Sequence, residues 1–160
     1  MNVYITYDRY ERNEWLSVYH IEKNRERAIK HFKEEDLIDF LSYGPDDCHT
    51  FQLQRVVLSS EQYKRLLFLV ENDGAEHPEY GKELEELLIR FYEEDEEFEP
   101  LTLYSTDGCS DNWELVEFYC EMENLDPEDD DHKEMAQEIL FNDDEIYTRV
   151  LKEYIAVAYR

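Results

Sequence analysis

The amino-acid sequence predicts a single α+β domain over residues 1–160, with a small antiparallel N-terminal sheet packed by helices. Apolar and polar residues alternate along short runs before residue 60, as they do in half-buried strands. After residue 60, apolar residues recur mainly at the three- and four-residue spacing of amphipathic helices. Strands followed by helices, here in the order β-β-α-β and then helices, are typical of the α+β class.

The predicted strands are rich in β-branched and aromatic residues. They cover residues 3–7, 15–21, 51–57 and 101–104. The first two are separated by a short polar stretch, which favours an antiparallel hairpin. Asn24 is a suitable N-cap for a helix over about residues 25–34, because its side chain can accept a hydrogen bond from the first turn. The near-neutral half of the chain, residues 1–70, is therefore expected to be rich in strand.

The predicted helices of the remainder have recognisable starts and stops. They run from Ser59 or Ser60 to Gly74, from Pro78 to about Phe91, from Asp111 to about Asn124, from Pro127 onward and from about Asp143 to Tyr159. Ser and Asp are favoured N-caps, Pro is tolerated in the first turn, and Gly is common just past the last turn. Trp113, Val116 and Cys120 are expected on one apolar side of their helix, and Ala158 is expected to face inward in the last one.

Negative charge is concentrated in the second part of the chain. The net charge is −26. Residues 1–70 hold ten Lys/Arg and twelve Asp/Glu, a net charge of −2, whereas residues 71–160 hold six Lys/Arg and thirty Asp/Glu, a net charge of −24. Repulsion on this scale destabilises a compact state, so some compensation is expected. A solvated face that only confers solubility is the alternative interpretation, but it does not predict so uneven a division.

A cytoplasmic location is expected from three absences in the sequence. The N-terminus has no basic and apolar leader, and the longest apolar runs are far shorter than the ~20 residues that span a bilayer. The three cysteines, Cys48, Cys109 and Cys120, are odd in number and irregularly spaced, which argues against a disulfide framework. No membrane partner is expected.

The segment from Asp126 to Glu134 is the densest acidic stretch and the candidate for a divalent cation. Calcium takes six to eight oxygen ligands, and the common calcium loop needs a central Gly, which this segment lacks. Carboxylates in the first turn of a helix are stabilised by the helix dipole, which is the interpretation we favour here. Metal binding stays an alternative, and no cofactor is predicted.

No motif in the sequence names a reaction, so the chain is predicted not to be an enzyme. It has no Gly-rich phosphate loop and no nucleophile elbow. Paired carboxylates carry no diagnostic weight in a chain with 42 Asp/Glu. Each cysteine is interpreted as a small buried apolar residue rather than a nucleophile.

Basic residues on the first predicted helix do not indicate direct nucleic-acid binding. They are Arg25, Arg27, Lys30 and Lys33, and acidic residues are interleaved with them. A net charge of −26 also repels phosphate groups. These cations could instead face acidic residues, either within the chain or across a homodimer. A structural homo-oligomer is therefore the second hypothesis.

The favoured site is an acidic surface that binds a basic protein. On a helix, residues three and four apart lie ~5–6 Å from each other, so several carboxylates fall on common stripes. The partner-binding set is Glu79, Glu83, Glu86, Glu93, Glu94, Asp95, Glu96, Glu97, Asp111, Glu114, Glu117 and Glu121, with Tyr92 and Phe98 as aromatic anchors. Because duplex DNA carries one negative charge per ~1.7 Å of axis, packed stripes of this kind approximate a phosphate array.

In size, acidity and abundance of Tyr, the chain resembles the DNA mimics of phages and mobile elements, which include anti-restriction and anti-CRISPR proteins. The resemblance is one of composition, it covers the C-terminal ninety residues, and it transfers no role to any single residue. It implies a non-enzymatic inhibitor that occupies a basic, nucleic-acid-binding protein of a defence or DNA-processing system.

Overall fold

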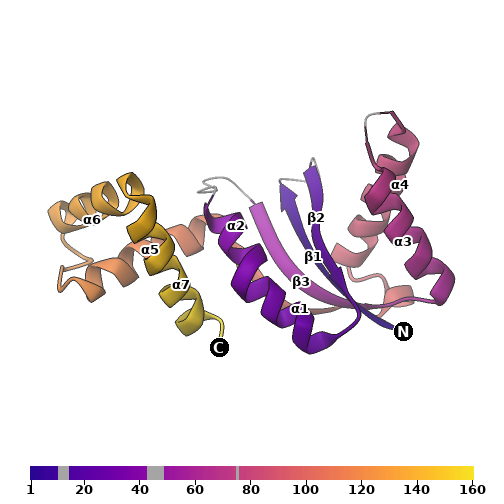
Figure 1. Ribbon diagram of the computed structural model, residues 1–160, viewed down its shortest axis with the longest axis horizontal. Coiled ribbons are helices and arrows are strands. Elements are labelled where there is room, and N and C mark those ends of the chain that lie inside the picture. Colours follow the sequence, from indigo (N-terminus) through magenta and orange to yellow (C-terminus); the bar gives the residue numbers. More distant parts are fainter. Residues whose placement is uncertain (11–14, 43–48, 75) are drawn as a thin grey trace. The chain divides into compact units, whose positions relative to one another are not determined.

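The fold is α+β, as the sequence predicts, with an antiparallel four-stranded sheet in the order β2-β1-β3-β4. The structure, a computed structural model, describes residues 1–10, 15–42, 49–74 and 76–160 (Figure 1). The strands are β1 (Asn2–Tyr10), β2 (Trp15–Glu22), β3 (His49–Val57) and β4 (Leu101–Asp107). The fourth predicted strand is therefore confirmed, at the edge of the sheet beside β3.

The helices also follow the predicted order. They are α1 (Arg25–His31), the π-helix η1 (Phe32–Asp36), α2 (Leu37–Ser42), α3 (Ser60–Asn72), α4 (Pro78–Tyr92), the short 3₁₀ helix η2 (Glu96–Phe98), α5 (Gly108–Met122), α6 (Asp130–Asn142) and α7 (Asp144–Ala158). Ser59 caps α3 in a reciprocal capping box with Gln62, and Pro78 occupies the first turn of α4. Within the described residues, no helix is long and apolar enough to cross a bilayer.

The chain forms two compact units, and both are discontinuous in sequence. Unit 1 contains residues 1–30 and 50–105, and unit 2 contains residues 31–49 and 106–160. The units therefore do not coincide with the two halves of different composition that meet at residue 70, and α3 and α4 belong to the same unit as most of the sheet. Unit 1 has 19 Asp/Glu and 11 Lys/Arg, a net charge of −8, whereas unit 2 has 23 Asp/Glu and 5 Lys/Arg, a net charge of −18.

The core of unit 1 lies between the sheet and the helices α3 and α4. Val3, Ile5 and Tyr7 of β1 point to one face and pack with Leu66 of α3 and Leu88 of α4. The residues that alternate with them on β1 are buried as well, so both faces of this strand are covered. The chain therefore buries nearly continuous runs on β1 and β3, rather than the one-sided alternation that the sequence analysis assumed.

A buried hydrogen-bond network crosses this core. The hydroxyl of Tyr7 donates to Oε1 of Gln54 at 2.8 Å and accepts from Nε2 of Gln52 at 2.6 Å. Nε2 of Gln54 in turn donates to the backbone carbonyl of Phe91 at 3.0 Å. Buried polar groups must form hydrogen bonds to offset the cost of desolvation, and each of these side chains is hydrogen-bonded to another polar group. The network fixes the end of α4 against β3.

The core of unit 2 is helical. α5, α6 and α7 contact one another, and α5 and α7 also contact α2 (Figure 1). The buried side chains include Leu115, Val116, Tyr119 and Cys120 of α5, Ala136 and Leu140 of α6, and Val150, Leu151, Tyr154 and Ile155 of α7. The hydroxyl of Tyr147 on α7 donates to the carbonyl of Leu41 on α2 at 2.6 Å, and burial raises the pKa of this phenol to about 12.

Two side chains of unit 2 were predicted to face inward and do not. The side chain of Trp113 is 54% exposed, and Ala158 is also exposed. Val116 and Cys120, four residues apart, are buried, and Trp113 lies at the margin of their face. The apolar spacing therefore identified the buried stripe of α5 but assigned one residue too many to it.

Candidate functional site

The predicted acidic residues divide between the two units. The group from Glu79 to Glu97 lies in unit 1, on α4 and the turn into η2, and the group from Asp111 to Glu121 lies on α5 in unit 2. Asp111 is part of α5, but its side chain lies outside the described part of the structure. Each unit therefore presents its own set of carboxylates.

In unit 1, arginines of the same unit neutralise three of the predicted carboxylates. The guanidinium of Arg65 on α3 donates two hydrogen bonds to Glu83, at 2.9 and 2.6 Å. Arg90 donates to Asp95 at 2.8 Å and also to Glu97. The hydrogen bond from Arg65 lowers the pKa of Glu83. The backbone N–H of Glu97, followed by the Arg90 side chain, lowers the pKa of Asp95.

The remaining predicted acids of unit 1 are exposed but only loosely grouped. Glu79 and Glu86 are exposed on α4, and the imidazole of His77 lies 3.4 Å from the Glu79 carboxylate. Glu93, Glu94 and Glu96 are exposed where α4 ends. Glu94 has a φ of 60°, in the left-handed region, because the chain reverses there toward η2. Unit 1 thus offers a mixed surface on which arginines alternate with carboxylates.

The two aromatic residues proposed as anchors occupy different environments. Phe98 is 2% exposed and stacks edge-on against Phe91, with ring centroids 5.0 Å apart. The expectation that Phe98 lies at an interface is therefore wrong, because its ring is part of the unit 1 core. Tyr92 is half-buried, and the guanidinium of Arg9 lies 3.7 Å from its ring centroid. The ring of Tyr92 is therefore partly accessible, and it already makes a cation–π contact with Arg9.

In unit 2, the predicted acids of α5 form one solvent-facing stripe. Glu114, Glu117 and Glu121 are all exposed, at the three- and four-residue spacing that places them on one side of the helix. That side is opposite the buried residues of α5. Only Glu114 has a side-chain partner, because it accepts a hydrogen bond from the Tyr154 hydroxyl at 2.7 Å. We refer to Glu114, Glu117 and Glu121 as the α5 stripe.

Carboxylates of the α5 stripe and of the loop before α6 influence the pKa of the buried Cys120 thiol. Burial raises the pKa of Cys120, and the charges of Glu117, Asp126 and Glu121 raise it further, whereas Lys133 lowers it. Only charges that lie near the sulfur act on its titration in this way. Asp126 follows Leu125, whose N–H donates to the carbonyl of Cys120 at 2.8 Å, so Asp126 lies beside the end of α5 that carries Glu121.

Unit 2 does not neutralise these charges internally. Of the described carboxylates between Trp113 and Arg160, none forms an ion pair with a Lys, Arg or His side chain of the described chain. The contrast with unit 1 follows from composition, because unit 2 has only five Lys/Arg for 23 Asp/Glu. The most strongly anionic surface of the described chain is thus on unit 2.

The segment from Asp126 to Glu134 is arranged as a helix start. Asp129 caps α6 and accepts hydrogen bonds from the backbone N–H groups of Asp131 and His132. The carboxylate of Asp126 accepts from the backbone of Glu128, and its own N–H donates to Nδ1 of His132. Among the described residues, no group of three or more His, Cys, Asp or Glu side chains is placed to hold a metal ion.

Exposed apolar residues accompany the acidic surface, and the sequence analysis missed them. Trp113 is 54% exposed, and the ammonium of Lys133 lies 5.3 Å from its ring centroid, which links α5 to α6. Met135 and Ile139 are exposed four residues apart on the outer side of α6. The spacing of α6 gave no signal of this exposure, because Met135 and Ile139 adjoin the buried Ala136 and Leu140 on one continuous apolar stripe of the helix.

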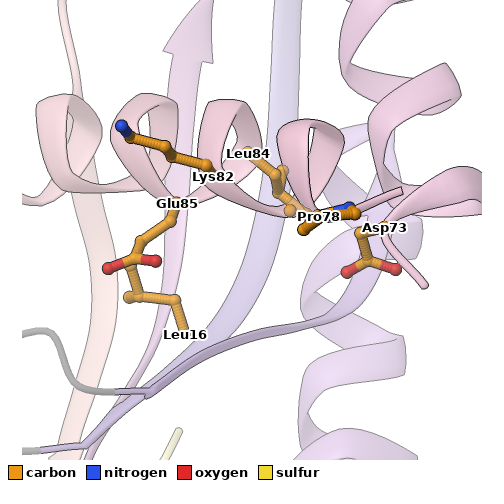
Figure 2. Close-up of a pocket in the computed structure, with 7 residues that line it drawn as sticks. Leu16, Asp73, Pro78, Lys82, Leu84 and Glu85 are labelled. Carbon is orange, nitrogen blue, oxygen red and sulfur yellow. The ribbon is translucent and has the colours of Figure 1, made fainter. Parts of the chain in front are cut away.

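Unit 1 has a cavity of about 460 Å³. Figure 2 shows its lining, with Lys82, Leu84 and Glu85 on α4, Asp73 at the end of α3 and Leu16 on β2. The described residues that line it provide one ammonium and two carboxylates as charged groups, and none of them is His, Cys or Ser. One lysine and two carboxylates do not by themselves identify a reaction. No family model matches the chain, and no curated protein or solved structure gives a significant match to it.

Proposed function

We propose that this chain is a non-enzymatic binding protein of the cytoplasm that uses the acidic surface of unit 2 to hold a basic protein partner. The surface consists of the α5 stripe, with Asp126 beside it and Trp113 on the same helix. In its specific form, the proposal is that the chain is a DNA mimic of a phage or mobile element, which inhibits a nucleic-acid-binding protein of a defence or DNA-processing system.

The observation that carries the proposal is the difference between the units in charge pairing. Unit 1 pairs Glu83, Asp95 and Glu97 with its own arginines, whereas no described carboxylate from Trp113 to Arg160 has a cationic partner. Repulsion among unpaired carboxylates costs folding free energy, which a cationic partner would relieve. A surface that only had to be soluble would not need a net charge of −18 on unit 2.

The chemistry of the surface selects the class of partner. Carboxylates on a helix stripe lie ~5–6 Å apart, a spacing at which Lys and Arg side chains of a phosphate-binding groove can contact several of them at once. Electrostatic complementarity of this kind accelerates association and gives a steep dependence on salt. Trp113 adds an apolar contact, and Trp is among the residues most enriched at the energetic centres of interfaces.

The test is affinity capture with matched charge variants. The immobilised full chain is exposed to the heparin-binding fraction of a bacterial lysate, which is enriched in phosphate-binding proteins. The first variant carries Glu117→Gln, Glu121→Gln and Glu134→Gln in unit 2. The control variant carries Glu76→Gln, Glu93→Gln and Glu94→Gln in unit 1, so the net charge changes equally. Glu114 is left intact because it accepts the Tyr154 hydroxyl.

The expected result is that the wild type and the unit 1 variant retain the same partner and the unit 2 variant does not. Retention should fall between about 50 and 200 mM salt, and duplex DNA should displace the partner. Equal losses with both variants would mean that only overall charge matters. Capture that DNA does not displace would remove the DNA-mimic form of the proposal. Capture of no nucleic-acid-binding protein at low salt would remove the whole proposal.

A further inference from the structure

A cavity of about 490 Å³ lies within unit 2, and none of its described lining residues belongs to the acidic surface. α7 forms one wall, and η1 with α2 forms the other. The lining residues are Lys33, Glu34, Ile38, Lys152, Ile155, Ala156, Tyr159 and Arg160. Its volume falls in the range of ~300–1,000 Å³ that is usual for small-molecule sites.

The wall from α7 is a single helical stripe. Lys152, Ile155 and Ala156 are spaced by three and four residues, so they lie on one side of the helix, and Tyr159 follows as its C-cap. Ile155 is 4% exposed and belongs to the core of unit 2 as well as to the cavity. The ring of Tyr159 packs edge-on against the buried Phe32, with centroids 6.3 Å apart. The cavity thus has an apolar floor that the core holds in place.

Most of the basic side chains of unit 2 lie in the lining of this cavity, although the unit is acidic overall. Unit 2 has five Lys/Arg, and three of them, Lys33, Lys152 and Arg160, line the cavity. Among the described residues, Glu34 is the only acidic side chain that lines it. Neither Lys152 nor Arg160 forms an ion pair with a described residue, although 23 Asp/Glu belong to the same unit.

The simpler explanation, that these cations neutralise the end of a helix, does not account for Lys152. The dipole of a helix attracts cations only within its last turn, which is ~3.6 residues. α7 ends at Ala158, and Lys152 lies more than one turn before that end. The position of Lys152 is therefore better explained by its place among the α7 residues that line the cavity.

We propose that this cavity binds an organic anion that has a carboxylate, sulfonate or phosphate head and an aromatic or aliphatic body. The head is held by Lys152 and Arg160, whose N–H groups make charge-assisted hydrogen bonds with such oxygens. The body packs on Ile155 and against the ring of Tyr159. This site does not depend on the proposed function, because it uses other residues and the opposite charge.

The test uses two fluorescent probes of nearly the same shape and the full-length chain. Anilinonaphthalene sulfonate carries an anionic head, and N-phenylnaphthylamine is its uncharged counterpart. Because a protein with a net charge of −26 repels anions at long range, a preference for the sulfonate must come from local cations. Urea unfolding of each variant checks that the fold is intact, since a loosened core also binds such dyes.

The wild type should bind the sulfonate more tightly than the neutral probe. Lys152→Gln should weaken the sulfonate about tenfold, the effect of one charge-assisted hydrogen bond, and should leave the neutral probe nearly unchanged. The control is Arg149→Gln, which removes the same charge from α7 outside the cavity and should change binding less than about twofold.

Three results would overturn the proposal. The wild type could bind no sulfonate, or it could bind both probes equally. Arg149→Gln could also weaken the sulfonate as much as Lys152→Gln does, which would make the preference a general charge effect. In the supporting case, backbone amide resonances of Ile155 and Tyr159 shift on titration with the sulfonate and those of the α5 stripe do not.

Discussion

The guanidinium of Arg65 on α3 donates two hydrogen bonds to the carboxylate of Glu83, eighteen residues further along the chain on α4. This pair joins two helices of the same unit and removes one carboxylate from the predicted partner surface. Arg90 does the same for Asp95 and Glu97 beside η2. The acidic face of unit 1 is therefore partly a set of internal ion pairs, whereas none of the described carboxylates from Trp113 to Arg160 in unit 2 has a cationic partner.

The first prediction concerns the pKa of Glu83. The hydrogen bond from Arg65 lowers this pKa in the folded state, so the pair contributes stability above the usual Glu pKa of about 4.3 and loses it as pH falls through the lowered value. Arg65→Gln should return the pKa of Glu83 toward its usual range. NMR titration of the Glu83 side-chain carboxyl carbon measures it. Arg90→Gln is the control and should leave Glu83 where it is; an equal shift in both variants would contradict a specific pair.

The second prediction concerns Phe98, whose ring is buried against Phe91. Phe98→Ala should lower the free energy of unfolding by about 3–5 kcal/mol, as large-to-small core substitutions do. Leu101→Ala, at a residue that is 49% exposed, is the matched control and should change it by less than about 0.5 kcal/mol. Urea unfolding measures both. If Phe98→Ala left the free energy of unfolding unchanged, the Phe98 ring would not be part of the core.

The elements of the fold could be predicted because their signals are local. The strand alternation of residues 3–7, the N-cap at Ser59 and the Pro at the start of α4 each act within a few residues. The grouping into units could not be predicted, because it depends on which helices pack on which surface. The chain passes between the units within α1, β3 and β4, where no change in composition marks a boundary.

The candidate site could be predicted only as a composition. Helical spacing correctly places Glu114, Glu117 and Glu121 on one exposed side of α5. It could not show that Arg65 reaches Glu83, because that contact depends on how α3 packs on α4. Phe98 was misplaced for a similar reason. It follows five consecutive acidic residues, but η2 turns its ring back into the core.

The third prediction separates a helix cap from a cation site at Asp129. Asp129→Ala should lower the free energy of unfolding by about 1 kcal/mol, because two backbone N–H groups at the start of α6 lose their acceptor. Asp129→Asn is the control, since Asn is an equally good N-cap but carries no charge, and it should be close to wild type. Thermal unfolding of the wild type with and without calcium completes the measurement. If calcium raised the unfolding temperature and Asp129→Asn abolished that rise, the segment would be a cation site.

The fourth prediction is a dependence of stability on pH that originates at His31. The Nδ1 atom of His31 lies 2.9 Å from the buried carboxylate of Asp36, five residues away, and the Nε2 atom is paired with Glu35. The π-helix produces this arrangement, because Leu37 N–H bonds to Phe32 C=O five residues earlier and the turn is one residue wider than in an α-helix. Burial alone would lower the pKa of His31, but the hydrogen bond and charge of Asp36, with Glu35, outweigh it and raise the pKa.

Since the folded-state pKa of His31 is raised, protonated His31 contributes stability that is fully present below its usual pKa of about 6.5 and is lost as pH rises through the raised value. His31→Gln should therefore be most destabilised relative to wild type in mild acid, and the difference should shrink toward alkaline pH. Asp36→Asn should lower the pKa of His31, as measured by NMR titration of the imidazole Cε1–H. A difference between wild type and His31→Gln that does not vary with pH would show that His31 contributes through packing and not through its charge.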